Sequence, residues 1–150
     1  MDDAGAILQA TLDDLGAAVM ADDWAGFLRR VILPFELQTE AGKIAVQDAP
    51  ELRAGYDEFQ LMLRTHRVTH YLRHARRAEF DGPDRIVGSY SSDILSHGKR
   101  ILPAYTSLMV IDLRGGQWCA SRIVNRWSND RWPVLTPKPI DDAEPERSRK

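Results

Sequence analysis

The sequence contains a single cysteine, Cys119, so no disulfide can form within the chain, and a reducing compartment is expected. It also lacks long apolar runs: none approaches the ~18 to 20 residues of a membrane span, and the acidic N-terminus has no signal-peptide core. Charge of one sign is missing too, because 20 Lys and Arg residues against 22 Asp and Glu residues leave a net charge of -2. We therefore expect a cytoplasmic protein that binds neither nucleic acid nor a membrane.

Motifs for cofactors and metals are absent as well. There is no Walker loop, dinucleotide fingerprint or Cys-x-x-Cys pair. His66, His70 and His74 are spaced four apart, which on a helix would place them on one face where they could bind a metal. The Asp81-Gly82-Pro83-Asp84 turn that follows favours a strand instead, and no acidic ligand lies in register. We predict neither a metal nor a cofactor.

What the second half of the chain does contain is the signature of long β-strands. Residues Arg85–Leu95, Ile101–Leu113 and Trp118–Trp127 are rich in Val, Ile, Tyr, Thr and Ser, and glycine-containing turns join them. The segment Val68–Phe80 is ambiguous, but the turn after it indicates a fourth strand. Long antiparallel strands twist and coil, so we expect a strongly curved, cone-shaped sheet with one concave face.

The first half supplies helices that would cover this face. Apolar residues at spacings of three and four predict an amphipathic helix over residues 4–21. A short second helix follows and is expected to end before Pro34, because the residue before a proline is disfavoured in the α region. A small hairpin over residues 35–47 comes next. Asp48 then begins a capping box, which predicts a third helix that ends near Thr65.

This order of elements predicts the class of fold. Helices segregated to one face of an antiparallel sheet make an α+β domain. We place this single domain at residues 1–135. The charged, apolar-poor segment 136–150 is expected to be an extended, disordered tail.

Four short motifs also occur in a recognisable order between residues 4 and 127. They are Asp22-Asp23-Trp24, Thr69-His70-Tyr71, Phe80-Asp81-Gly82-Pro83-Asp84 and Gly115-Gly116-Gln117-Trp118. Their order and spacing resemble the nuclear transport factor 2-like superfamily, also called cystatin-like, and within it the SnoaL-like group. That superfamily includes isomerases, dehydratases, cyclases, dioxygenase β subunits and proteins that only bind, so the resemblance implies a fold before it implies an activity.

The resemblance suggests candidate catalytic residues. Some enzymes of this group carry a His–Asp dyad, and His70 matches the position of their histidine. The aspartate lies four residues before the tryptophan that Trp24 matches, and Met20 occupies that position here. A thioether cannot carry a proton, so the dyad is broken unless Asp22, Asp23 or a carboxylate elsewhere substitutes. His70 is the candidate general base, and Tyr90 is the candidate donor to a developing oxyanion.

A cavity between helices and sheet would be the ligand site. Strand alternation is expected to turn His70 and His74 inward, together with Arg76. Tyr90 would be the other polar group. The expected apolar walls are Leu12, Leu15, Val19, Met20, Trp24, Phe27, Tyr56, Phe59 and Met62. Mostly apolar walls with a few polar groups are typical of a small-molecule site.

Two functions remain open. The first is a SnoaL-like protein that binds a small, largely apolar molecule, with cofactor-free isomerase, dehydratase or cyclase chemistry at His70 as its catalytic form. The second is a non-catalytic structural or interaction subunit that resembles the β subunit of an aromatic-ring-hydroxylating dioxygenase. In either case we expect a homodimer that forms through the outer sheet face. The apolar residues assigned to that face are Val87, Leu95, Cys119, Ile123 and Trp127.

Overall fold

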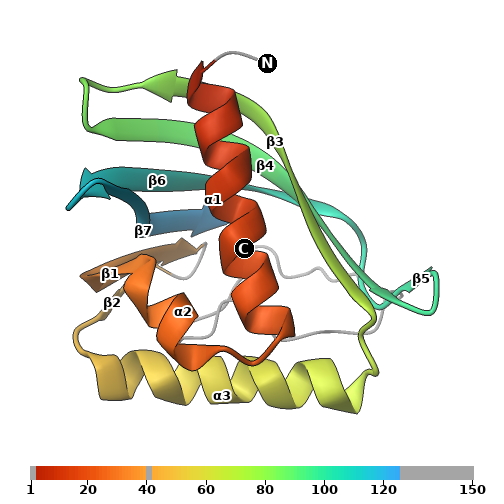
Figure 1. The fold of residues 1–150 in the computed structure, drawn as a ribbon. Coiled ribbons are helices and arrows are strands. Elements are labelled where there is room, and N and C mark those ends of the chain that lie inside the picture. The colour runs from red at the N-terminus through yellow and green to blue at the C-terminus, as the bar shows by residue number, and fades with distance from the viewer. Residues whose placement is uncertain (1–2, 40–41, 126–150) are drawn as a thin grey trace.

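The computed structural model describes residues 3–39 and 42–125, and Figure 1 shows how their helices and strands are arranged. The helices are α1 (Asp3–Met20), α2 (Trp24–Arg29) and α3 (Ala49–Thr65). The strands are β1 (Val31–Thr39), β2 (Gly42–Val46), β3 (His70–Phe80), β4 (Arg85–Ser96), β5 (Lys99–Arg100), β6 (Tyr105–Arg114) and β7 (Gln117–Asn125). The α+β class and the order of the major elements are confirmed. None of these helices has the length and apolarity that crossing a bilayer requires.

The strands form one sheet in the order β2-β1-β7-β6-β4-β3, with the short β5 paired to β4. Figure 1 shows β3 and β4 as long, bent strands. The sheet is mixed, because β1 and β7 pair in parallel while the other pairs are antiparallel. The prediction of a wholly antiparallel sheet is therefore wrong at this pair. Hairpin turns set the direction of strands that are neighbours in sequence, whereas β1 and β7 meet across most of the chain.

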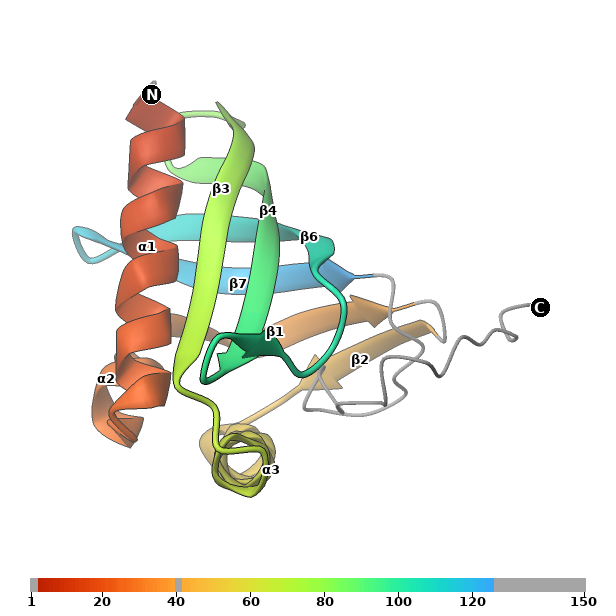
Figure 2. The same ribbon diagram turned by 90° about the vertical axis from the view of Figure 1, so that its right-hand side faces the viewer.

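Helix α1 covers the β3 side of the sheet, and α3 lies across the end where β1 and β2 lie (Figures 1 and 2). Apolar side chains of α1 at helical spacing are buried, with Leu8 fully enclosed and Leu12 only 1% exposed. The helix is also fixed to edge strand β3 through Gln9. Its Nε2 donates to the Arg73 carbonyl at 2.9 Å, and its Oε1 accepts from the Ala75 amide at 2.8 Å.

Helix α3 begins as the capping box predicts. The Asp48 side chain accepts a hydrogen bond from the Glu51 amide at 3.0 Å, and the Glu51 carboxylate accepts one from the Gln47 amide at 3.0 Å. These reciprocal bonds satisfy amides that a helix start leaves unpaired. Leu52 and Tyr56 then lie on the buried face of the helix.

The two boundaries that differ most from prediction both involve proline. Pro34 does not end α2, which stops at Arg29, but lies inside β1. The β1–β7 pairing shifts register between Val31 and Glu36, so the missing N–H of Pro34 interrupts no regular ladder. Pro103 lies between β5 and β6, and the predicted strand Ile101–Leu113 begins only after it, at Tyr105 of β6.

The predicted last strand is confirmed as far as Asn125. Its remaining part, up to Trp127, lies outside the described residues. So does the predicted tail over residues 136–150. The domain boundary at residue 135 therefore stays a prediction.

Candidate functional site

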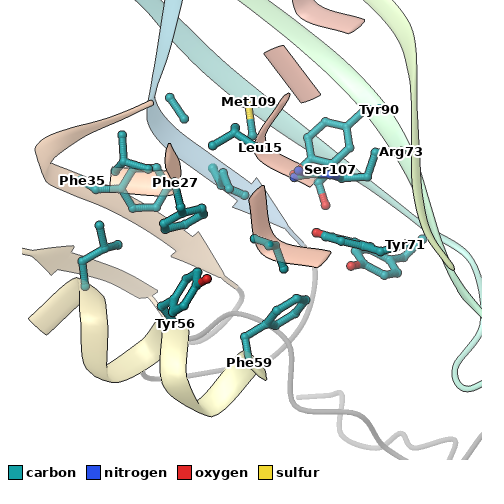
Figure 3. A pocket seen from close by; sticks show the side chains of 16 residues that line it. Leu15, Phe27, Phe35, Tyr56, Phe59, Tyr71, Arg73, Tyr90, Ser107 and Met109 are labelled. Carbon is teal, nitrogen blue, oxygen red and sulfur yellow. The ribbon is translucent and has the colours of Figure 1, made fainter. Parts of the chain in front are cut away.

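A cavity lies between the helices and the inner face of the sheet (Figure 3). Its volume is about 90 Å³. A single water molecule needs roughly 10–15 Å³ measured in the same way, so the cavity can hold a small organic molecule or several waters. All three helices and five of the strands (β1, β3, β4, β6 and β7) supply lining side chains, with β4 contributing only Tyr90.

Most of the lining is apolar and aromatic. Helix α1 contributes Leu15 and Val19, and β6 contributes Met109. Aromatic rings close the side toward α2 and α3. The rings of Phe27 and Tyr56 lie 5.2 Å apart between centroids. This part of the cavity offers dispersion contacts and almost no hydrogen bonds.

The polar groups gather at the other end, on β3, β4 and β6. Arg73 pairs in register with Ser92 of β4, and Ser92 pairs with Tyr105 of β6. One step along the sheet, Tyr90 pairs with Ser107. Cross-strand partners share a face of the sheet, so these side chains form one cluster. Figure 3 shows Arg73, Ser107, Tyr90 and Tyr71 close together at this end.

Arg73 is the positively charged residue of the lining. Its Nη2 donates to the Leu12 carbonyl at 3.2 Å, and its guanidinium carbon lies 4.8 Å from the centre of the Tyr71 ring and 5.8 Å from that of Tyr90. Its Nε is buried without a hydrogen-bond partner, and within the described part of the chain no carboxylate forms an ion pair with it. Gly16 of α1 lies next to the guanidinium, since a Cβ at that position would be in ordinary van der Waals contact with Nη2, at 3.8 Å.

Burial holds three tyrosines of the cavity, Tyr56, Tyr90 and Tyr105, in their protonated form. Burial raises the pKa of Tyr90 to about 12, although Arg73 and Ser107 act in the opposite direction. Burial also raises the pKa of Tyr105 well above its usual value. Burial raises the pKa of Tyr56 too, assisted by Asp22, whose carboxylate accepts a 2.8 Å hydrogen bond from the Tyr56 hydroxyl. At neutral pH all three are therefore hydrogen-bond donors and not bases.

Several of the predicted site residues lie in the cavity wall. The structure places there Leu15, Val19, Phe27, Tyr56, Phe59 and Tyr90. Met20, Trp24 and Met62 do not line the cavity. Met20 is 38% exposed at the end of α1, and Trp24 lies outside the wall against Tyr56, with the ring centroids 5.1 Å apart. Met62 is buried in a neighbouring cluster with Leu63.

The prediction that His70 and His74 face the cavity is wrong. Both side chains are exposed, while Tyr71 and Arg73 alternate with them and line the cavity. Arg76 also points away, and its Nε donates to Ser91 at 3.2 Å. A strand has two faces with a period of two, so choosing the wrong one moves every side chain at once. The signal for the correct choice was Tyr71 and Ala75 on one face, against His70 and His74 on the other.

Two further expectations concern metals and the outer sheet face. The described residues contain no group of three or more His, Cys, Asp or Glu side chains placed to hold a metal ion.

Of the residues predicted for the outer face, Val87 and Leu95 alternate with buried core residues and lie there. Ile123 lines the cavity instead, which is a correction, and Trp127 is outside the described residues. Cys119 is buried, with its thiol 3.5 Å from the Arg29 carbonyl oxygen.

Comparison with known proteins supports the fold and no more. No protein-family model matches the chain, and no curated protein matches it. Solved structures do match. An NTF2-like protein of unknown function from Pseudomonas putida has a TM-score of 0.60 at 12% identity, over 95% of this chain and 96% of that one. A cystatin-like protein of unknown function from Nostoc punctiforme has a TM-score of 0.59 at 15% identity, over 87% and 94%. A protein of unknown function from Mycobacterium tuberculosis has a TM-score of 0.58 at 20% identity, over 81% and 69%.

Proposed function

The chain has the NTF2-like, or cystatin-like, fold, and from this premise we propose that it binds a small, largely apolar molecule in the cavity between its helices and sheet. The observation that carries the proposal is the cavity itself, about 90 Å³ of space in a domain of 150 residues. Protein interiors are close-packed, and an unfilled hollow costs stability. A hollow with apolar walls and polar groups at one end is typical of a ligand site.

Binding is better supported than acid–base catalysis. The cavity lining contains no His, Asp, Glu, Lys or Cys, so it offers no group that would take up a proton near neutral pH. His70, the candidate base, is exposed on the other face of β3. Tyr90 keeps its proton, because its pKa is about 12, and can only donate a hydrogen bond. We therefore propose a binding protein without the isomerase, dehydratase or cyclase step that the resemblance allows.

The test compares the binding of a neutral probe to the wild-type protein and to a variant whose cavity is filled by a larger side chain. Fluorobenzene should bind to the wild-type protein, as followed by fluorine NMR. Ile123→Trp, which places an indole into the lining, should weaken that binding by about tenfold or more, equivalent to about 1.4 kcal/mol. Leu61→Trp is the control, because Leu61 of α3 is 57% exposed and does not line the cavity. Equal binding by both variants would show that the probe does not enter this cavity.

One observation on the outer face supports the expected homodimer, which is compatible with either of the two functions. Val87 pairs with Val110 there, and Leu108 pairs with Val124, so adjacent strands carry a continuous apolar patch. Such a patch is typical of a subunit contact. We propose that a second copy of the chain covers it.

Sedimentation velocity tests this assembly. The wild-type protein should sediment as a dimer, and Leu108→Glu should sediment as a monomer, because a buried carboxylate without a partner would oppose association. Leu61→Glu on α3, where the leucine is 57% exposed, is the control and should remain dimeric. A monomeric wild-type protein would contradict the proposal directly.

A further inference from the structure

Arg73 has an environment that the described residues, 3–39 and 42–125, do not complete. It is a cation at every working pH. The other lining residues in the described part of the chain are apolar, aromatic or hydroxyl-bearing, and none of them carries a negative charge. A charge taken out of water without a partner is costly, and arginine is rarely buried unless something pairs with it. A partner therefore remains to be supplied.

The unmet hydrogen bonds lie in the same place. Arg73 Nε is buried and has no acceptor. Within the described residues, Ser107 Oγ and Ser92 Oγ are likewise buried without a hydrogen bond of normal geometry, although Ser107 lies near the Tyr90 hydroxyl and Ser92 near that of Tyr105. Buried polar groups are satisfied in most proteins, so three together are unusual. Ser92 pairs in register with Arg73, and Ser107 pairs with Tyr90, so these groups belong to one cluster on the inner face.

Contacts with neighbouring residues hold the Arg73 side chain in place. Its backbone carbonyl accepts from Gln9 of α1, and its Nη2 donates to the carbonyl of Leu12 on the same helix. The Tyr71 ring lies beside its guanidinium plane at 4.8 Å. A guanidinium that is held in place loses little conformational entropy when an anion arrives, which favours binding.

We propose that the cavity takes a small organic acid, with its carboxylate against Arg73 and the hydroxyls of Tyr90 and Ser107, and its apolar body toward Phe27 and Phe59. This inference rests on the proposed binding function and names the chemical class of its ligand. A carboxylate matches the planar donors of a guanidinium. Its single negative charge balances the single positive charge, whereas a phosphate dianion would leave one charge buried and unpaired.

The alternative is that Arg73 only clamps α1 to the sheet through Leu12 and the tyrosine rings. Comparing acids with their neutral amides separates the two. The probes are 3-phenylpropionate and 3-phenylpropanamide, with hexanoate and hexanamide as an aliphatic pair. Isothermal titration calorimetry at pH 7 gives the Kd of each. The wild-type protein should bind each acid about 10- to 100-fold more tightly than its amide, the range that hydrogen bonds to a charged group support.

Variants assign this preference to the guanidinium. Arg73→Met should lose the preference for acids and keep its affinity for the amides. Arg76→Met is the control on the same strand, because Arg76 faces outward and donates to Ser91, and it should keep the preference. If Arg73→Met does not fold, Arg73→Lys is measured instead. It keeps the charge without the planar fork, so a reduced preference for acids is expected.

Three results would overturn the inference. The amides would bind the wild-type protein as tightly as the acids, the preference for acids would survive in Arg73→Met, or phenyl phosphate would bind more tightly than benzoate. If fluorobenzene still binds in that event, the proposed binding function stands and only the ligand class is wrong. If neither fluorobenzene nor any acid or amide binds, both proposals fail together.

Discussion

Replacing Gly88 with alanine should destabilise the domain by about 3 kcal/mol, at the upper end of what overpacking usually costs. A Cβ at this position would lie 2.4 Å from Leu8 Cδ2, 2.7 Å from the Arg77 carbonyl oxygen and 3.1 Å from Ala78 Cβ. The leucine could turn aside, but the carbonyl belongs to β3, which pairs with β4 along its whole length. The strands would have to separate locally. Urea denaturation gives the free energy of unfolding that checks this value.

A double-mutant cycle shows which contact is responsible. Leu8→Ala alone removes a fully buried side chain and should cost about 2–5 kcal/mol. Combined with Gly88→Ala, the total should be smaller than the sum, because the closest contact is gone. It should remain above the cost of Leu8→Ala, since the carbonyl of Arg77 is still in place. Ser89→Ala, on the opposite face of β4, is the control. A loss below about 0.5 kcal/mol for Gly88→Ala would mean that the helix does not lie this close to the sheet.

The second large effect is a steep fall in the free energy of unfolding above pH 10. Burial raises the pKa of Tyr90 from 10.0 to about 12, so between these values the unfolded chain loses a proton that the folded chain keeps. The folded state then binds more protons, and its stability declines as pH rises. The contribution is fully present below pH 10. By pH 12 Tyr90 alone accounts for a loss of about 2 kcal/mol, and the raised pKa values of Tyr105 and Tyr56 act in the same direction.

Urea unfolding at several alkaline pH values, with Tyr90→Phe beside the wild-type protein, measures this contribution. The phenylalanine variant cannot ionise here, so its stability should decline less between pH 10 and pH 12. The difference between the two proteins should be constant below pH 9 and should shrink above it. Curves that stay parallel through the alkaline range would indicate that Tyr90 is not buried in the folded state.

The sequence was informative wherever a structure depends on neighbouring residues. The capping box at Asp48 predicted the start of α3, and glycine-containing turns predicted the hairpins of the second half. Spacings of three and four predicted α1 almost to the residue. Pairing between distant segments was not predictable in this way. The parallel contact of β1 with β7 follows from how the whole sheet closes, and no local pattern records it.

The face of β3 that lines the cavity was predicted wrongly for a related reason. Period two defines two faces, but only packing against α1 decides which of them is inside. The histidines suggested one answer because they resembled a catalytic pattern, while Tyr71 and Arg73 occupy the inner face. A register shift between Ala75 and Arg77 then changes the alternation along the same strand. Arg73 could have been found only by asking which face of β3 is the more aromatic.

The bonds from Gln9 to β3 also bear on how molecules of this protein meet one another. β3 is the last strand of its sheet, and such a strand presents free amides and carbonyls to which a strand of another chain can add. Gln9 occupies the Ala75 amide and the Arg73 carbonyl, which both point toward that open side. The helix that closes the cavity therefore also blocks part of the edge strand to which strands of other chains could add in a fibril-like assembly.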